Sequence, residues 1–320
     1  MASTPEHRPP VAEREAPATC ARLGRLPDFL VVGGMKCGST TLHGHLSNHP
    51  DLFLCRLKEP QFFSRDEVFS RGFDWYRSLF AEAGSRLCGE SSTCYSRAPH
   101  FGDVAKRIHS HLPDARLLYL LRHPVDRAYS HYRHEAQIRM VDGRTRVPTF
   151  EEMLEETNEL VDTSDYWMQL QQYLSYYSRE QIHVLFLEDL RVRPEEVLDG
   201  VERFLGVRSL GAQLVDQPRA NAFGDKLARN GMHERLDAIR NSQALRAVID
   251  CVPSGLRSRV RHGLTDPRVA RRLLSGRIRS KQQELAPMRA ETRKLLLDRF
   301  ADSNRAIESF VGAPIPEWSA

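Results

Sequence analysis

A glycine-rich segment with one lysine and three hydroxyl residues is the part of this sequence best suited to bind an anion. It runs from Gly33 to Thr41 (GGMKCGSTT) and follows a short apolar run, Phe29–Val32. Glycines let backbone N–H groups approach a ligand closely, and a helix that begins at the hydroxyl residues points its first N–H groups at the same place. The pattern predicts a buried strand, a phosphate-binding loop and a helix.

The position of the lysine narrows the chemistry of this loop. Gly33 and Gly38 have the glycine spacing of a Walker loop, G-x-x-x-x-G-K-[ST]. Ser39 occupies the Walker lysine position, and the only lysine of the segment, Lys36, lies inside the loop. This argues against an ordinary kinase or ATPase. A structural glycine turn with an exposed lysine stays open as the alternative.

A second candidate anion site follows the apolar run Arg116–Leu121, the strongest strand signal in the chain. Arg122 ends this run, and a helix that carries Ser130 follows. Pro124 suits the first turn of that helix, because the N–H that proline lacks would be unpaired there in any case. The structural alternative for Arg122 is a salt bridge to Asp126.

Lys58 and Glu59 form a third polar group, held on a backbone that is not helical. Pro60 follows them directly, and proline disfavours the helical conformation of the residue before it. Phe62 and Phe63 are available to anchor this loop in the core. Glu59 could alternatively be a loop carboxylate that only pairs with Lys58.

The remaining elements predict an α/β fold with a central, mainly parallel sheet flanked by helices. Further strands are expected at 86–90 and 182–187, and helices at 103–112, 149–160, 165–178, 194–205 and 287–310. The last helix makes the C-terminal region helical. Ligands of such sheets bind beyond the carboxyl ends of the strands, where both candidate anion sites fall.

Composition indicates a globular protein without a membrane span. Of the 320 residues 28% are charged and 41% apolar, with a net charge of +4 that does not by itself indicate nucleic acid. No apolar stretch approaches the ~18 residues of a membrane helix. Residues 1–27 are expected to form a flexible leader, without features of a signal peptide or anchor, before a single domain at 28–318.

The six cysteines show no C-x-x-C pattern and no zinc spacing. Reduced thiols, no metal site and a cytoplasmic location are therefore expected. Cys37 lies in the glycine-rich loop but is not predicted to be catalytic. Residues 207–281 contain sixteen Lys and Arg against six Asp and Glu. The segment 207–286 is therefore interpreted as a basic helical insertion or lid over an anionic ligand, with a solvated basic surface as the alternative.

Several linked segments resemble the sulfotransferases that use 3′-phosphoadenosine 5′-phosphosulfate (PAPS). They are Gly33–Thr41, Lys58–Phe63, Gly89–Tyr95, Leu121–Ser130, Phe204–Gly206 and Pro314–Trp318. The chain is most similar to the bacterial branch related to the catalytic domains of heparan sulfate sulfotransferases. The resemblance covers about residues 28–318 and is weakest at 207–286. It implies a P-loop-like sulfotransferase fold that transfers a sulfuryl group and releases 3′,5′-adenosine bisphosphate (PAP) without a metal.

The resemblance also implies the donor-binding residues. Lys36 resembles the lysine that contacts the 5′-phosphosulfate and steadies the leaving phosphate. The other residues at 5′-phosphate positions are Cys37, Gly38, Ser39, Thr40 and Thr41. Arg122 and Ser130 resemble the pair that binds the 3′-phosphate, which distinguishes PAPS from ATP.

The catalytic base is implied less directly. Glu59 lies where the heparan branch carries its base, and Lys58 corresponds to a basic residue near the transferring group. Another branch uses a histidine, so the histidines stay as less favoured candidates: His43, His45, His49, His131 and His134. Glu90 is an alternative carboxylate.

Physical chemistry supports such roles. A sulfuryl group in transit carries less negative charge than a phosphoryl group, so lysine and backbone donors suffice without Mg²⁺, and the base must lie within hydrogen-bond reach of the acceptor hydroxyl. The expected acceptor is a small natural product, a glycolipid or a glycan, and not a nucleic acid. The alternatives are a kinase that uses ATP and Mg²⁺, and a non-catalytic polyanion-binding protein. The sequence gives no oligomeric state.

Overall fold

The structure is a computed structural model that describes residues 24–141, 146–210, 213 and 285–318. Residues 1–23 of the expected leader lie outside the described residues, as does nearly all of the expected basic lid at 207–286. The described chain therefore carries the sheet, its helices and the C-terminal helix.

The described residues form a five-stranded parallel sheet in the order β2-β3-β1-β4-β5. The strands are β1 (Phe29–Gly33), β2 (Leu52–Leu54), β3 (Leu87–Ser91), β4 (Arg116–Leu121) and β5 (Ile182–Phe186). The predicted α/β class and parallel sheet are confirmed. Strand β2 was not predicted, because three residues are too few to show a periodic pattern.

Every helix predicted for the described residues is present, but the helices at 66–69, 72–78 and 187–192 were not predicted and one predicted helix is divided in two. Their bounds are α1 Ser39–Ser47, α2 Asp66–Phe69, α3 Gly72–Ser78, α4 Val104–His109, α5 Pro124–Val141, α6 Phe150–Glu156, α7 Glu159–Asp162, α8 Tyr166–Leu174, α9 Leu187–Val192, α10 Pro194–Leu205 and α16 Ala290–Val311, with short 3₁₀ turns η2 Thr93–Ser96, η3 Arg179–Gln181 and η4 Pro316–Trp318. The capping box at Thr149 is present, with Glu152 N donating to Thr149 Oγ1 at 3.2 Å. The single helix expected at 149–160 is wrong. Thr157 takes an extended backbone there, and its hydroxyl accepts a hydrogen bond from Glu159 N to begin α7.

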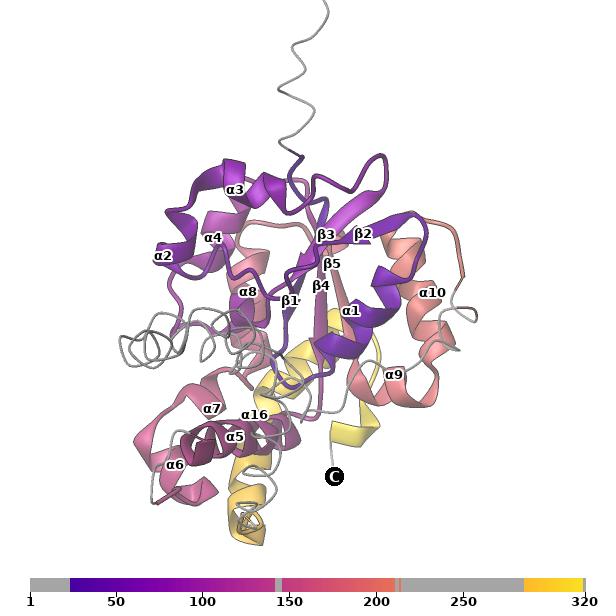
Figure 1. Cartoon of the computed structure of the whole chain (residues 1–320). Coiled ribbons are helices and arrows are strands. Elements are labelled where there is room, and N and C mark those ends of the chain that lie inside the picture. Colours follow the sequence, from indigo (N-terminus) through magenta and orange to yellow (C-terminus); the bar gives the residue numbers. More distant parts are fainter. Residues whose placement is uncertain (1–23, 142–145, 211–212, 214–284, 319–320) are drawn as a thin grey trace, which may run out of the picture.

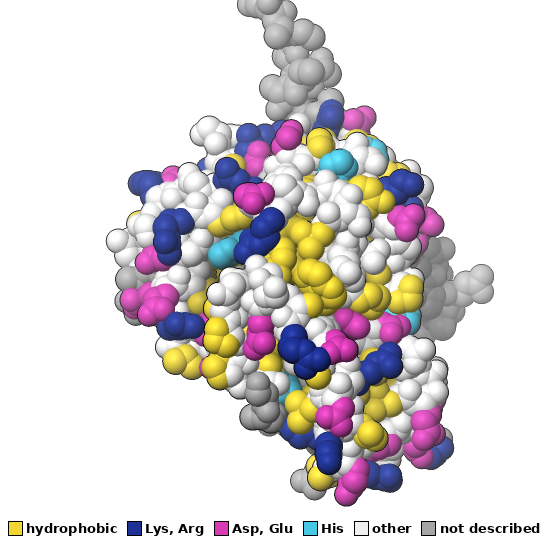
Figure 2. Space-filling view, turned by 180° about the vertical axis from the view of Figure 1, so that it is seen from behind, with side chains coloured by type: hydrophobic (Ala, Val, Ile, Leu, Met, Phe, Trp, Pro, Cys, Tyr) yellow, Lys and Arg dark blue, Asp and Glu magenta, His cyan; other side chains and the backbone are white. Residues whose placement is uncertain are grey.

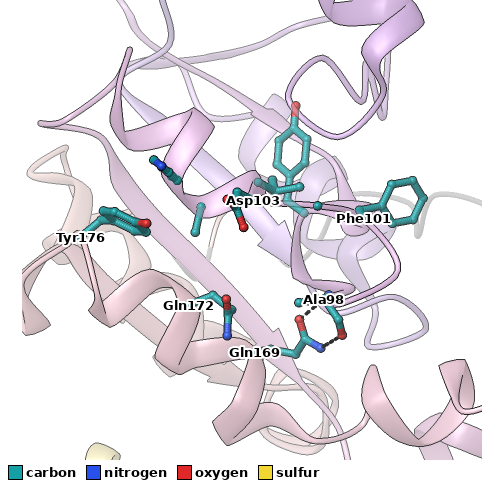
Figure 3. Close-up of a pocket in the computed structure, with 11 residues that line it drawn as sticks. Ala98, Phe101, Asp103, Gln169, Gln172 and Tyr176 are labelled. Atoms are coloured by element: carbon teal, nitrogen blue, oxygen red, sulfur yellow. Dashed lines mark hydrogen bonds between the residues drawn. The ribbon is translucent and has the colours of Figure 1, made fainter.

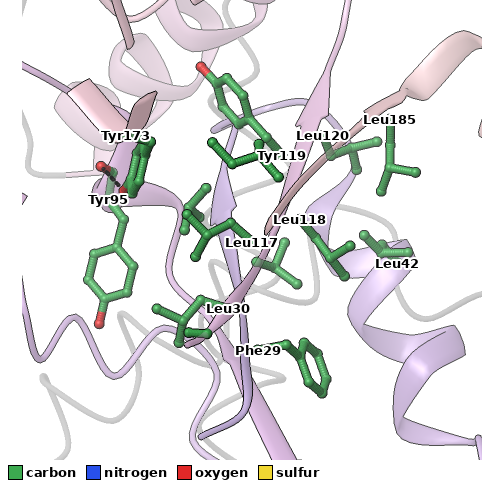
Figure 4. Close-up of a cluster of buried hydrophobic side chains, with 14 of the residues drawn as sticks. Phe29, Leu30, Leu42, Tyr95, Leu117, Leu118, Tyr119, Leu120, Tyr173 and Leu185 are labelled. Atoms are coloured by element: carbon green, nitrogen blue, oxygen red, sulfur yellow. Dashed lines mark hydrogen bonds between the residues drawn. The ribbon is translucent and has the colours of Figure 1, made fainter. Parts of the chain in front are cut away.

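The core lies on both faces of the two central strands. Every residue of β1 is buried, and so are the last five residues of β4, as expected for strands covered on both faces. Figure 4 shows side chains of these strands packed with others from α1, β5 and α8. Phe62 and Phe63 are fully buried, and Phe62 stacks on Tyr76 with ring centroids 4.2 Å apart. The predicted anchoring of the 58–63 loop is therefore confirmed.

The chain leaves β1 and β4 in opposite directions, which makes the space between their carboxyl ends a topological switch point. From β1 it crosses to β2 at one edge, and from β4 it crosses to β5 at the other. In Figure 1, α1, α9 and α10 lie on one side of the sheet, and α4 and α8 lie on the other. Ligands of open parallel sheets bind at such a point, and the first residues after β1 and β4 are the two predicted anion sites.

The surface seen in Figure 2 mixes acidic and basic side chains around a central group of hydrophobic ones, so this face carries no broad area of one charge. In the part of the chain that the structure describes, none of the helices has both the length and the apolar character needed to cross a membrane.

Candidate active site

The loop after β1 joins the two central strands at the switch point. Gly34 N donates to Leu120 O at 2.5 Å, which holds the start of the loop against the end of β4. Gly38 then precedes α1 with φ 92° and no side-chain cap. This conformation is one that residues with a Cβ rarely adopt, so glycine is required here; the nearest atom to an added Cβ would be the movable Leu187 Cδ1, at 2.6 Å. The N terminus of α1 is thereby directed into the loop, as anion binding requires.

Lys36 lies in this loop among other cations. Its backbone is left-handed, with φ 69°. Its pKa is lowered to about 8, first by burial and then by the nearby charges of Arg122 and Arg133, whereas Glu59 acts in the opposite direction. Cations that face one another in this way repel, and an anion placed among them relieves the repulsion. The predicted loop lysine is therefore part of a cationic cluster and is not an isolated exposed side chain.

Arg122 and Ser130 belong to the same end of the sheet. Arg122 directly follows β4, and Tyr166 Oη fixes its carbonyl with a hydrogen bond of 2.8 Å. Pro124 is the first residue of α5, and Ser130 lies in its second turn. The alternative reading of Arg122 as the salt-bridge partner of Asp126 is not what the structure shows, since Asp126 Oδ1 accepts a hydrogen bond from Arg293 Nη1 at 2.9 Å.

Lys58 connects the loop that carries Glu59 to the start of α1. Its ammonium group lies 3.0 Å from Thr40 Oγ1 and 3.2 Å from Glu59 Oε1. The other oxygen of Glu59 accepts a hydrogen bond of 3.2 Å from Thr93 Oγ1. Glu59 has φ 60°, so the predicted non-helical backbone is confirmed. The Lys58–Glu59 pair foreseen as the structural alternative exists, but the 30% exposure of the Glu59 side chain leaves it accessible.

The other loop positions divide into polar and buried ones. The Cys37 side chain is fully buried against Tyr166, and burial raises the pKa of its thiol to about 11. The Cys37 thiol is thus inert at neutral pH, and only its backbone can face a ligand. The Ser39 side chain is also buried, whereas Thr40 and Thr41 are half-buried. The described cysteines are free thiols, and no group of three or more potential metal ligands occurs among the described residues.

Comparison with known proteins identifies the family of the chain. The family model of the sulfotransferase domain matches residues 26–236. The chain belongs to the sulfotransferase family. A solved structure of a sulfotransferase from Alicyclobacillus acidocaldarius superposes with a TM-score of 0.60 at 24% identity, covering 92% of this chain and 100% of that one, which shows the same fold.

Curated relatives of this sulfotransferase are larger proteins. It is 30% identical over 219 residues to the bifunctional heparan sulfate N-deacetylase/N-sulfotransferase of Drosophila melanogaster, a match that covers 58% of this chain and 20% of the relative. It is also 30% identical over 222 residues to bifunctional heparan sulfate N-deacetylase/N-sulfotransferase 1 of Mus musculus, covering 63% and 24%. The matched part is thus a quarter or less of each relative. The resemblance to heparan sulfate sulfotransferase domains is confirmed.

Two candidate bases of this sulfotransferase are fully buried. Glu90 is completely buried, and its carboxylate receives hydrogen bonds from three hydroxyl groups, so it cannot meet an acceptor. His131 is fully buried too, and burial lowers its pKa far below the usual value.

The other histidines are sorted by their partners. His49 is buried beside Glu202, and His45 lies in the last turn of α1. Nδ1 of His43 is 3.0 Å from Ser91 Oγ. His134 on α5 is the histidine that lies near Lys36 and Glu59, and burial followed by the charge of Lys36 lowers its pKa to about 4. His134 and the half-buried His43 thus remain rivals of Glu59 for the role of base.

Arg133 and Arg127 are cations of the site that the sequence did not single out. Arg133 and His134 lie three and four positions after Ser130, which places all three on one face of α5. Arg127 is fully buried, and its Nη2 donates to Leu160 O at 2.7 Å. It also lowers the pKa of Lys36. The spacing of three residues from Ser130 could have indicated Arg133 from the sequence. It could equally have indicated Arg127, which lies three residues before Ser130.

A small enclosed pocket lies away from the cationic cluster, between α8 and the segment Ala98–Lys106 (Figure 3). Gln169 closes one end through hydrogen bonds with the backbone of Ala98 of 2.9 and 2.7 Å. The open space is about 30 Å³, which holds water but not a nucleotide.

Proposed function

We propose that the chain transfers the sulfuryl group of PAPS to a hydroxyl of a small natural product, glycolipid or glycan. The observation that carries this proposal is that the charges of Arg122 and Arg133 act on Lys36, in the loop that leads into the N terminus of α1. Several positive groups at one uncapped helix start suit a donor with phosphate groups at both ends of its ribose. The names of the heparan sulfate relatives support a glycan as acceptor, with an amine as the second choice after a hydroxyl.

Lys36, Arg122, Ser130 and the backbone of the loop each have a proposed task. The backbone from Cys37 to Thr41 binds the 5′-phosphate, while Arg122 and Ser130 bind the 3′-phosphate. PAPS, when bound, supplies the sulfuryl group and a phosphate leaving group. Lys36 stabilises the negative charge that develops on the leaving oxygen.

On the acceptor side, Glu59 takes the proton of the acceptor hydroxyl. Lys58, through its contacts with Glu59 and Thr40, holds the base loop in register with α1. Because these tasks use only side chains and backbone donors, the proposed transfer has no metal. The cytoplasmic location stays a prediction.

Donor binding is the first property to test. Calorimetric titration with PAP, and with ATP and ADP as controls, should show binding that needs the 3′-phosphate and does not depend on Mg²⁺. Arg122→Ala should weaken PAP binding by about 1.5–3 kcal/mol, the worth of a hydrogen bond to a charged group, or roughly 10- to 150-fold in Kd. Arg56→Ala, which removes an exposed arginine paired with Glu82, is the matched control.

The same titration separates the alternatives. A preference for ATP with Mg²⁺ would replace the proposal with the kinase reading. Binding of any polyanion with a steep dependence on salt, and no selectivity for the 3′-phosphate, would favour the non-catalytic polyanion-binding protein.

The lowered pKa of Lys36 predicts how PAP binding depends on pH. In the free protein this pKa is about 8, and a bound anion raises it. Above pH 8 binding must therefore take up a proton, and the affinity should fall by up to about tenfold per pH unit. Titrations from pH 7 to 9.5 in two buffers of different ionisation enthalpy measure both effects. Lys36→Arg should abolish the proton uptake, because the guanidinium group stays charged. An equal dependence in both proteins would remove Lys36 from the donor site.

A further inference from the structure

Glu90 is a fully buried carboxylate at the end of β3, directly beneath the loop that carries Lys58 and Glu59. Three hydroxyl groups donate hydrogen bonds to it, one from α3 and two from the segment that follows β3: Tyr76 Oη at 2.9 Å, Tyr95 Oη at 2.6 Å and Ser92 Oγ at 2.7 Å. The mechanism assigns no task to this group. A buried carboxylate is costly unless it is well hydrogen-bonded, so its presence here calls for a function.

Two of the three hydroxyls also hold the base loop. Gln61 N donates to Ser92 Oγ at 3.0 Å, and Phe63 N donates to Tyr95 Oη at 3.3 Å. A hydroxyl has a single proton. Because the hydroxyl groups of Ser92 and Tyr95 donate their protons to Glu90, their oxygen lone pairs face the loop and accept hydrogen bonds from its N–H groups.

The loop needs such support because its backbone is strained. Glu59 has φ 60° and Gln61 has φ 57°, and residues with a Cβ adopt this left-handed region only where the surroundings hold them. Glu59 N is bonded in addition to Ser91 O at 3.0 Å. The strand end around Glu90 thus supplies three acceptors to three N–H groups of the loop.

We propose that Glu90 is a positioning residue, which in its ionised form orients the hydroxyls of Ser92 and Tyr95 to accept the loop amides and so holds Glu59 against the acceptor. This inference rests on the proposed function, because it takes Glu59 as the base. Burial raises the pKa of Glu90 to about 7, while the three hydroxyl hydrogen bonds lower it. Those hydrogen bonds are what keep the ionised form accessible near neutral pH.

The matched variants are Glu90→Gln, Ser92→Ala, Tyr95→Phe and Tyr76→Phe. The side-chain amide that Glu90→Gln introduces donates where one carboxylate oxygen accepted, so at least one hydroxyl can no longer give its proton to residue 90 and loses the orientation that directs its lone pairs to the loop. Ser92→Ala and Tyr95→Phe each remove one acceptor of a loop amide. Tyr76 donates to the same carboxylate, but neither Gln61 N nor Phe63 N bonds to it, so Tyr76→Phe is the control.

Turnover and donor binding should respond differently. Glu90→Gln, Ser92→Ala and Tyr95→Phe should lower kcat by between about 10- and 100-fold, the effect of a misplaced catalytic group, and leave the Kd for PAP within about twofold. Tyr76→Phe removes no acceptor of a loop amide but raises the pKa of Glu90, so it should lower kcat less than these three variants at pH 7 and approach the wild-type kcat as the pH rises and Glu90 ionises. Glu90→Gln and Ser92→Ala should be non-additive, since one acts through the other. The proposal would be overturned if all four variants lost the same thermal stability and none of them changed kcat.

Hydrogen exchange tests the inference without any activity assay. The amides of Gln61 and Phe63 should exchange at least about tenfold faster in Glu90→Gln than in the wild type or in Tyr76→Phe. Unchanged exchange would overturn the positioning role even where kcat falls. Fast exchange in Glu90→Gln, together with no binding of PAP by the wild type, would show that Glu90 supports the loop but would reject the proposed function. Failure of the positioning role and failure of the proposed function are therefore distinguishable.

Discussion

Lys36→Ala should abolish detectable sulfuryl transfer while the protein stays folded. Removing one charge-stabilising donor from an active site typically lowers kcat by roughly 10²–10³-fold, and Lys36 is the cation placed on the loop between β1 and α1. Its left-handed backbone does not complicate the test, because alanine and lysine both carry a Cβ and have the same strain at φ 69°. Initial rates with PAPS at saturating acceptor measure the effect.

The matched control is Lys106→Ala, which removes an exposed lysine of α4 that none of the proposed tasks uses. It should retain the wild-type rate, and circular dichroism should show the same fold for both variants. Normal turnover in Lys36→Ala would refute the assignment of the loop. A parallel loss of rate in Lys106→Ala would mean that general charge, and not the position of Lys36, supports activity.

The sequence predicted those parts of the site that depend on neighbours along the chain. The glycine at 38 and the lysine at 36 follow from the requirements of one tight turn, and their geometry agrees with the prediction. Arg122 and Ser130 were placed because each follows a strand of strongly apolar character. Local physical requirements leave a local pattern, which a single sequence displays.

Contacts between distant segments left no such pattern. Asp126 pairs with Arg293, 167 positions away, and not with Arg122, four positions away. Which face of α5 meets the loop depends on the register of β4 beside β1, so the spacing from Ser130 did not by itself select Arg133 or favour His134 over the other candidate histidines. Glu90 is enclosed by Tyr76 and Tyr95, whose hydroxyl groups donate hydrogen bonds to it. These contacts exist only after α3 and η2 have packed on the sheet, so the sequence around Glu90 does not show them.

The catalytic base is the part of the site for which the sequence alone leaves the most candidates. Candidate bases have to be sorted by burial and by hydrogen-bond partners, both of which are set by tertiary packing. In the folded chain Glu90 and His131 are enclosed, whereas Glu59 stays accessible near Lys36. His43 and His134, which are half-buried, stay as the histidine alternatives to Glu59.

Glu59→Gln should lower kcat by roughly 10²–10⁴-fold, the usual contribution of a general base, with little change in the Kd for PAP at pH 7. Glutamine keeps the shape of the side chain, its oxygen can still accept a hydrogen bond from Lys58, and the Thr93 hydroxyl can turn to accept one from its NH2 group, so the loop should remain in place. Because Glu59 raises the pKa of Lys36, its neutralisation should lower that pKa and begin the loss of PAP affinity at a lower pH. Steady-state rates and calorimetry from pH 6 to 9 measure both effects.

Glu82→Gln is the control, since it neutralises an exposed glutamate in an ion pair with Arg56 and should leave rate and affinity unchanged. An unaltered rate in Glu59→Gln would transfer the role of base to a histidine, and either His134→Asn or His43→Asn should then lose activity. If Glu59→Gln is inactive and His134→Asn keeps a substantial rate, the carboxylate is the base. Because the pKa of His134 is about 4, its imidazole is neutral at neutral pH. It therefore adds no positive charge beside Lys36, whereas a protonated imidazole would repel the cations that bind the donor.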